Sequence, residues 1–218
     1  MSIGLLGKKI GMTRVYDQES GRMTPVTVVD VAGNEWVQVK SADKDGYNAV
    51  QAGFTDKKAK RVTKAEGGHF SKHGAIPKQL VREFRVENAS DLPEAGAEHP
   101  GATMFADGQW VDVIGTTRGK GFQGVVKRHG FSGQNMSHGS MMHRRPGAIA
   151  AGSTPGLVWK NQKMPGHDGV VRRTVQNLKV VSVRAEDGAL LISGAIPGPK
   201  NGFVIVRPAK KKPAPAKG

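Results

Sequence analysis

The chain contains no cysteine among its 218 residues. Disulfide bonds and thiolate metal sites are therefore excluded, and the composition suits a reducing cytosol. Long hydrophobic runs are missing too, because no stretch approaches the roughly 20 apolar residues that a membrane-spanning helix needs. The start, Met1–Lys9, has no cationic region before its short apolar patch, so we expect no signal peptide and a cytoplasmic location.

Acidic residues are nearly missing from one long segment. Gly115–Arg173 contains ten Lys or Arg residues but only one acid, Asp168, for a net charge of +9. The segment also contains twelve glycines and three prolines, and it shows no sustained hydrophobic period. A compact domain rarely carries so long an unpatterned segment, so we expect this one to be functional or disordered.

The charge of the whole chain is concentrated in this segment. The net charge is +15, from 33 bases and 18 acids, yet residues 1–114 have 15 of each and residues 174–209 net only +2. Residues 210–218 add four lysines. Concentrated positive charge points to a polyanion, either nucleic acid or an anionic membrane. The glycines and prolines of Gly115–Arg173 forbid an amphipathic membrane helix, which leaves nucleic acid.

Short strand-like stretches flank the basic segment on both sides, at residues 12–16, 22–31, 36–40, 47–54, 80–86, 101–115, 178–183, 189–193 and 203–206. Their close spacing is typical of a small barrel or sandwich, so we predict a mainly β fold. A turn over residues 18–21 and an Asp187-Gly188 hairpin turn separate neighbouring strands.

These stretches define the expected domains. Residues 1–118 and 170–209 form a globular β domain, in which residues 55–100 are a small inserted α/β region with a short helix over 63–73. Residues 119–169 form a long extended loop. Residues 210–218 are a basic, low-complexity tail that is disordered when free.

A glycine motif opens the basic segment. Gly119–Gly124 reads GxGxxG, but a dinucleotide site would need a sizeable helix next and an acid about twenty residues further on. Residues 125–130 allow at most two turns of helix, and no acid lies between Gly115 and Asp168. The favoured interpretation is that glycine lets backbone amides approach phosphate closely. Ordinary turns remain the alternative.

A metal site or a general base is one interpretation of three histidines in the segment, His129, His138 and His143. No carboxylate lies near them in sequence, however, to complete a metal shell or to orient an imidazole. Ser137 and Ser140 likewise lack an acid partner for a catalytic triad. We therefore predict neither catalysis nor a metal or other cofactor. Histidine among arginines is better suited to stacking on bases or donating to phosphate.

Arginine is densest at Arg144-Arg145-Pro146-Gly147. Such charges would repel one another unless a polyanion neutralised them, and guanidinium groups bind phosphate bidentately and stack on bases. Trp159 is either a core residue or a stacking platform. The predicted RNA-binding residues are Arg118, Lys120, Lys127, Arg128, His129, His138, His143, Arg144, Arg145, Trp159, Lys160, Lys163, Arg172 and Arg173.

The sequence resembles the bacterial members of the universal ribosomal protein L3 family of the large subunit, over nearly the whole chain. The resemblance is strongest from Phe105 to Arg128, and several further matches occur in the correct order. These are Gly7–Thr13, His143–Gly147, Thr154–Gly156 and Lys163–Gly166.

This resemblance implies a translation-factor-like β-barrel on the solvent side of the large subunit. It also implies an extension that threads through 23S rRNA towards the peptidyl-transferase centre, with its tip near residues 145–155. A two-stranded finger of about 22 residues per arm would reach at most about 70 Å. A role in early assembly and contacts with neighbouring ribosomal proteins, but no small-molecule substrate, are further implications.

One position departs from the family pattern. Many bacterial members carry a glutamine, methylated on its side-chain amide, just before Thr-Pro-Gly, and here that position is Ser153.

Two other functions are alternatives to a ribosomal protein. An RNA-modifying enzyme would need a nucleophile or an acid–base pair, for which the segment offers only Asp168. A nonspecific nucleic-acid compactor fits the charge but not a fixed β scaffold.

Overall fold

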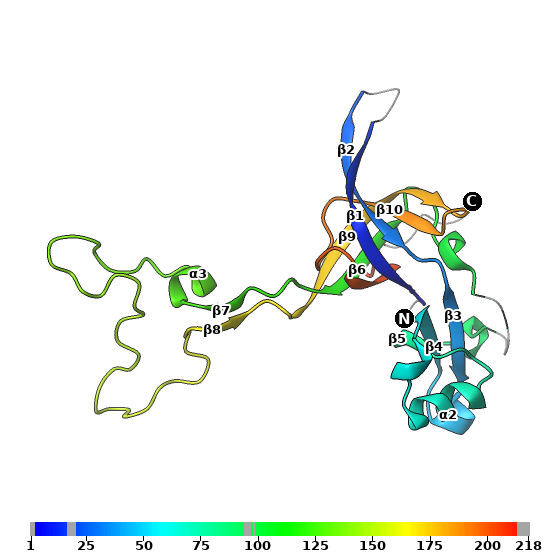
Figure 1. Cartoon of the computed structure of the whole chain (residues 1–218), viewed down its shortest axis with the longest axis horizontal. Coiled ribbons are helices and arrows are strands. Elements are labelled where there is room, and N and C mark those ends of the chain that lie inside the picture. The colour runs from blue at the N-terminus through cyan, green and yellow to red at the C-terminus, as the bar shows by residue number, and fades with distance from the viewer. Residues whose placement is uncertain (1–2, 17–20, 94–96, 98, 213–218) are drawn as a thin grey trace. The chain divides into compact units, whose positions relative to one another are not determined.

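The structure, a computed structural model, describes residues 3–16, 21–93, 97 and 99–212. The chain divides into two compact units, one formed by Met1–Thr116 with Arg172–Gly218 and the other by Thr117–Val171. We call the first the β unit and the second the loop unit. Figure 1 labels most of the strands and two of the helices along the chain.

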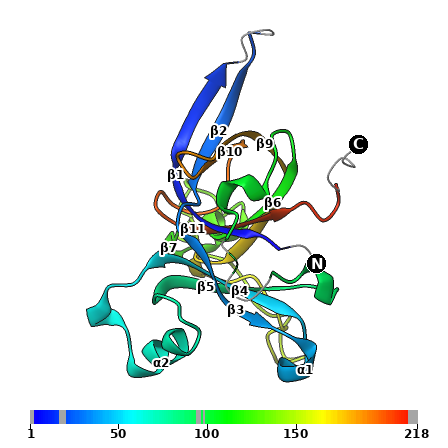
Figure 2. The same ribbon diagram turned by 90° about the vertical axis from the view of Figure 1, so that its right-hand side faces the viewer.

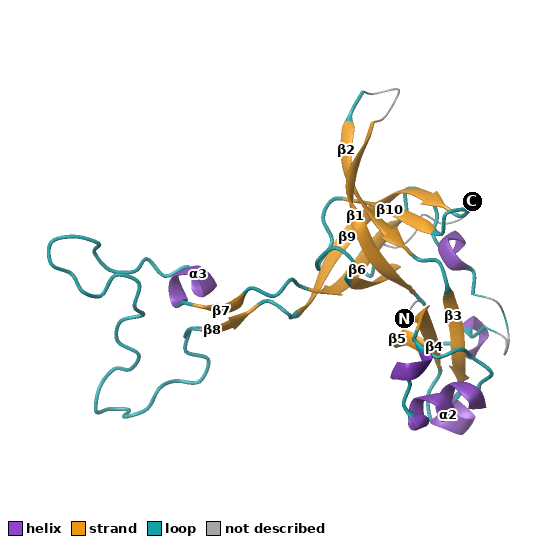
Figure 3. Cartoon of the chain, in the orientation of Figure 1, coloured by secondary structure: helices purple, strands orange, loops and turns teal. Residues whose placement is uncertain are grey.

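Strands predominate in the β unit (Figure 3), so the predicted mainly β fold is confirmed. The strands are β1 (Leu5–Tyr16), β2 (Met23–Asp30), β3 (Asn34–Lys40), β4 (Ala49–Asp56), β5 (Lys78–Arg85), β6 (Trp110–Thr116), β9 (Arg172–Arg184), β10 (Ala189–Ser193) and β11 (Phe203–Pro208). The helices are α1 (Ala42–Asp45) and α2 (Lys64–Lys72), with short 3-10 turns η1 (Ala59–Arg61), η2 (Ala89–Asp91) and η3 (Gly101–Met104).

Six of these strands pair in a closed, antiparallel ring in the order β1-β11-β6-β9-β10-β2. β1 and β2 stay paired as far as Tyr16 and Met23, and Figures 1 and 2 show this part as a two-stranded ribbon that continues past the ring. The predicted Asp187-Gly188 turn joins β9 to β10, and Gly188 has a positive φ of 58° that suits glycine. The other predicted turn, over residues 18–21, lies mostly outside the described residues.

The start of β1 and strand β11 pack against other residues on both of their faces. Successive side chains of a strand point in opposite directions, so Leu5 packs in the core of the ring while Leu6 packs in a second cluster with Phe54 and Phe84. β11 divides in the same way, because Val204 and Val206 enter the ring core while Phe203 and Ile205 pack on the second cluster. One strand pair therefore serves two hydrophobic cores.

The second cluster belongs to a separate sheet with the order β3-β4-β5, which Figure 2 shows beside α2. The assignment of residues 36–54 to the barrel is therefore wrong, and the additional region begins at Asn34 rather than at residue 55. The Asn34 side chain accepts from the Leu6 amide at 3.1 Å and donates to the Leu6 carbonyl at 2.8 Å. It thus satisfies the backbone of β1 as a neighbouring strand would, and the chain leaves the ring there.

The stretch predicted as strand over residues 101–115 is only half strand. Residues 101–104 form η3, and β6 begins at Trp110. Ala102 and Phe105 are buried in the core of the ring, so the apolar residues that resembled a strand are core contacts of a turn. Of the predicted tail, residues 213–218 lie outside the described residues.

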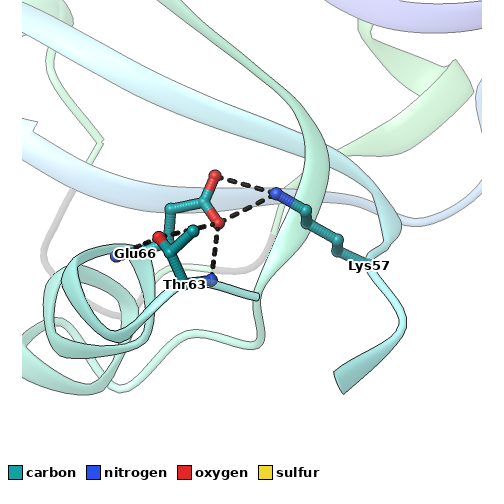
Figure 4. Close-up of polar contacts among 3 residues, drawn as sticks. All are labelled: Lys57, Thr63 and Glu66. Atoms are coloured by element: carbon teal, nitrogen blue, oxygen red, sulfur yellow. Dashed lines mark hydrogen bonds and ion pairs between the residues drawn. The ribbon is translucent and has the colours of Figure 1, made fainter. Parts of the chain in front are cut away.

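Helix α2 forms where the sequence predicted a helix, despite Gly67 and Gly68. Its start is a capping box, in which the Thr63 hydroxyl accepts from the Glu66 amide and Glu66 accepts from the Thr63 amide (Figure 4). Lys57 adds a hydrogen bond of 2.8 Å to each carboxylate oxygen of Glu66. The bond from Lys57, followed by that from Thr63, lowers the pKa of Glu66, so the cap stays ionised at neutral pH.

Lys78 is a buried lysine at the start of β5. Its Nζ lies 2.7 Å from a carboxylate oxygen of Glu35 and 2.8 Å from one of Asp56, while its side chain is only 2% exposed. Both carboxylates are well exposed, so water can replace the ammonium group around them. The aliphatic stem, packed against Gly53, is then the larger contribution to stability.

We expect Lys78→Ala to lower the free energy of unfolding by about 2–3 kcal/mol, mostly through the cavity that it leaves. Lys78→Met fills the same volume without the charge and should lower it by only about 1 kcal/mol. Urea denaturation of the two variants checks this. Equal losses would show that the ion pairs, rather than packing of the stem, hold β5 in place.

Candidate nucleic-acid interface

The loop unit, every residue of which is described, has little regular structure. Strands β7 (Gly121–Gln123) and β8 (Gly166–Asp168) are joined by three residue pairs, and a single short helix, α3 (Val125–His129), follows β7. Figure 3 shows the chain from α3 to β8 as loop. The expected long two-stranded finger is thus paired only near its base, because glycine and proline interrupt any longer ladder.

The two ends of the unit are held together by their backbones. The Thr117 amide donates to the Val171 carbonyl at 3.0 Å, and the Val170 amide donates to the Thr117 carbonyl at 3.2 Å. Gly169 has a φ of 82°, and a Cβ there would overlap the Arg118 carbonyl oxygen. Only glycine fits this close approach, so Gly169 has a clear structural task at the base of the loop unit.

Three predicted RNA-binding residues make contacts within the unit. The Lys120 ammonium lies 2.9 Å from Asp168, and this bond is the main cause that lowers the pKa of the Asp168 carboxyl. Arg128 donates to the Met164 carbonyl at 2.9 Å, and a ring nitrogen of His129 lies 3.1 Å from the same oxygen. These residues join the two arms near their base, although Arg128 keeps further N–H donors for a ligand.

The remaining predicted charged residues extend into solvent. They are exposed, and among the described residues none makes a side-chain hydrogen bond or ion pair. They are Arg118, Lys127, His138, His143, Arg144, Arg145, Lys160 and Lys163 in the loop unit, with Arg172 and Arg173 at the start of β9. The loop unit has eight Lys or Arg residues and one acid, so its charge of +7 is not balanced internally. A polyanion would supply that balance.

Exposed apolar side chains accompany these charges. Trp159 is 64% exposed, so the interpretation of it as a core residue is wrong, and its role as a stacking platform stays a prediction. Met141 is 87% exposed and Phe122 is 66% exposed, with the Phe122 ring edge-on to His167. Trp159 was among the predicted RNA-binding residues, but Met141 and Phe122 were not, because they carry no charge. The signal that could have found them is apolar residues without helical or strand spacing. Exposed apolar groups on this scale mark a surface that a partner covers.

The histidines do not form a metal site. Within the described part of the chain, no three His, Cys, Asp or Glu side chains gather closely enough to hold a metal ion. His138 and His143 both have positive φ values, of 55° and 39°, and lie exposed in irregular chain.

Among the described residues, no helix is long and apolar enough to cross a membrane.

Comparison with known proteins decides the family. The family described as Ribosomal protein L3 matches residues 56–190, which include the whole loop unit. The chain belongs to the ribosomal protein L3 family. A relative from Akkermansia muciniphila is 60% identical over 97% of this chain and 100% of its own length. Relatives from Vibrio parahaemolyticus and Alkaliphilus metalliredigens are 51% and 48% identical, each over 96% of this chain and at least 98% of their own length.

Each of these relatives is named Large ribosomal subunit protein uL3. The resemblance that the sequence motifs indicated is therefore confirmed. As a member of the ribosomal protein L3 family the chain is a ribosomal protein rather than an enzyme. The rival interpretation of an RNA-modifying enzyme is set aside on this ground.

Proposed function

We propose that this chain is a structural constituent of the large ribosomal subunit in the cytoplasm and that its loop unit binds 23S rRNA directly. The observation that carries the proposal is the loop unit itself. It exposes unpaired arginines, lysines and apolar side chains on a backbone with little regular structure. RNA offers the phosphates, unstacked bases and grooves that such a surface fits.

The two units have different roles in this proposal. The closed ring of the β unit is the translation-factor-like barrel that the family resemblance implies, and it serves as a rigid mount. Residues 119–169 are the part of the loop unit that penetrates the RNA. This part follows the rRNA towards the peptidyl-transferase centre. There its Lys and Arg side chains neutralise phosphates where RNA helices converge. The protein thereby supports subunit assembly and contacts neighbouring ribosomal proteins.

Sedimentation tests the proposal. Tagged protein should migrate one-to-one with large subunits through a sucrose gradient in high salt, because a constituent built into the folded subunit is held by packing as well as by the phosphate contacts that salt weakens. A variant that lacks residues 131–163 keeps the β unit and controls for recruitment by that unit alone. Wild-type protein that stays free or follows DNA in the gradient would contradict the proposal.

A further inference from the structure

A groove in the β unit has the chemistry of a second anion site. It has a volume of about 480 Å³ and lies among β5, β6, β9 and β11. Its apolar lining comes from Phe84, Ile114, Ile205 and Pro208. Its basic lining comes from Arg82, Arg85, Arg172, Arg207 and Lys210. Of these residues, only Arg172 was predicted from the sequence to bind RNA.

The groove remains positive after its acids are counted. Five bases face two carboxylates, Glu83 and Glu87, which leaves a net charge of +3. Glu83 is moreover engaged by the Lys40 ammonium at 2.8 Å, and Lys40 stands outside the lining. Burial raises the pKa of Glu83, but the hydrogen bonds from Lys40 and Tyr47 and the nearby positive charges of Lys40 and Arg85 together outweigh it, so the net shift is downward. Local positive charge over an apolar floor favours an anionic, partly apolar ligand.

Arg207 provides the sharpest observation. Its Nε is buried and has no hydrogen-bond partner among the described residues, and its Nη2 lies 3.9 Å from the Asp112 carboxylate, beyond hydrogen-bonding distance. Asp112 is itself satisfied by backbone, accepting from the Asn177 amide at 3.0 Å and the Lys210 amide at 3.3 Å. A buried donor without an acceptor is costly, and the Arg207 side chain, which lines the groove and is 34% exposed, can turn this donor towards an anionic oxygen there.

We propose that this groove binds a phosphodiester segment of RNA, with the phosphate on the arginines and the sugar over the apolar floor. The inference rests on the proposed function, because rRNA is the polyanion that the chain is proposed to meet. Arginine favours phosphate through its planar pair of donors, and four of the five bases are arginines. Arg172 follows directly after Val171, the last residue of the basic loop unit. The segment proposed to bind RNA is therefore continuous in sequence with a residue of the groove.

Salt-dependent binding of the full chain to 23S rRNA tests the groove. The main variant is Arg82→Gln with Lys210→Gln, because both side chains are exposed and, within the described part of the chain, Arg82 bonds only to the neighbouring Val81 carbonyl. Each lost phosphate contact should reduce the slope of log K against log salt by about one. Over the decade from 1 M to 0.1 M salt, that slope corresponds to about tenfold weaker binding per residue.

Two further variants make the result specific. Lys60→Gln with Arg61→Gln removes the same charge from an exposed pair on η1 and should change the slope far less. Arg207→Lys keeps the charge but removes the buried Nε–H, so it should weaken binding with little change of slope. Thermal unfolding of each variant shows whether it is folded. If Arg207→Lys does not fold, the variant with Arg82→Gln and Lys210→Gln still decides the test.

The outcomes separate this inference from the function on which it rests. If wild-type protein binds 23S rRNA and the Arg82/Lys210 variant binds with an unchanged slope, the groove is not an RNA site while the loop interface stands. If wild-type protein does not bind 23S rRNA, both proposals fail. Binding of a poly-glutamate peptide that depends on Arg82 and Lys210, with rRNA binding unchanged, would assign the groove to an acidic protein segment instead.

Discussion

Asn34→Asp should lower the free energy of unfolding by about 3–5 kcal/mol at neutral pH, the cost of an uncompensated buried charge. Asn34 is 8% exposed, and its amide nitrogen donates to the carbonyls of Leu6, at 2.8 Å, and Val31, at 2.7 Å. A carboxylate can donate to neither carbonyl and would face both with a negative charge. The substitution therefore breaks the junction between the ring and the sheet β3-β4-β5.

The pH dependence of this variant has a definite sign. Burial beside two carbonyl oxygens should raise the pKa of the new carboxyl in the folded protein above its unfolded value near 3.9. A carboxyl with a raised folded pKa destabilises the fold increasingly as the pH rises from the unfolded pKa through the folded pKa. The deficit relative to wild type should therefore be small at pH 4 and largest at pH 7.

Urea denaturation at several pH values checks this prediction. Asn201→Asp is the matched control, since Asn201 is an exposed residue of the same unit and aspartate tolerates its φ of 64°. That control should stay within about 0.5 kcal/mol of wild type. An Asn34→Asp protein that is as stable as the control at pH 7 would mean that the junction does not depend on the side-chain amide.

Local sequence patterns predicted most strands but not their partners. β-branched residues and turn residues located β2, β10 and β11 to within a few residues, because alternation and turns are local properties. Which strand pairs with which is decided by contacts between distant residues, such as Leu5 with Val206. Residues 36–54 were therefore assigned to the barrel, since their own alternation is the same in either sheet.

For the candidate interface too, the sequence predicted the segment but not the contacts within it. Charge counting found the loop unit, because an excess of +9 over one segment is visible without any structure. It could not show that Lys120 pairs with Asp168 or that Arg128 donates to the Met164 carbonyl, contacts that depend on how the two arms meet. The groove around Arg207 was equally hidden, because its bases come from three separate stretches of sequence.

Arg144→Ala with Arg145→Ala should weaken binding of the full chain to 23S rRNA about 100-fold at 0.1 M salt. Both guanidinium groups are exposed, and within the fully described loop unit neither has a side-chain partner. Two lost phosphate contacts reduce the slope of log K against log salt by about two, which gives two decades of affinity over the decade below 1 M. Large subunits that contain the variant should also assemble poorly or form peptide bonds slowly.

Stability separates an RNA contact from a role in the fold. Because neither arginine belongs to a hydrophobic core and both are exposed, the thermal unfolding of the isolated variant should match that of wild type within about 0.5 kcal/mol. Lys60→Ala with Arg61→Ala, which removes an exposed basic pair from η1, controls for the general loss of charge and should weaken binding much less. If the Arg144/Arg145 variant loses thermal stability in proportion to its affinity, these arginines serve the fold and the loop unit owes its RNA binding to other residues.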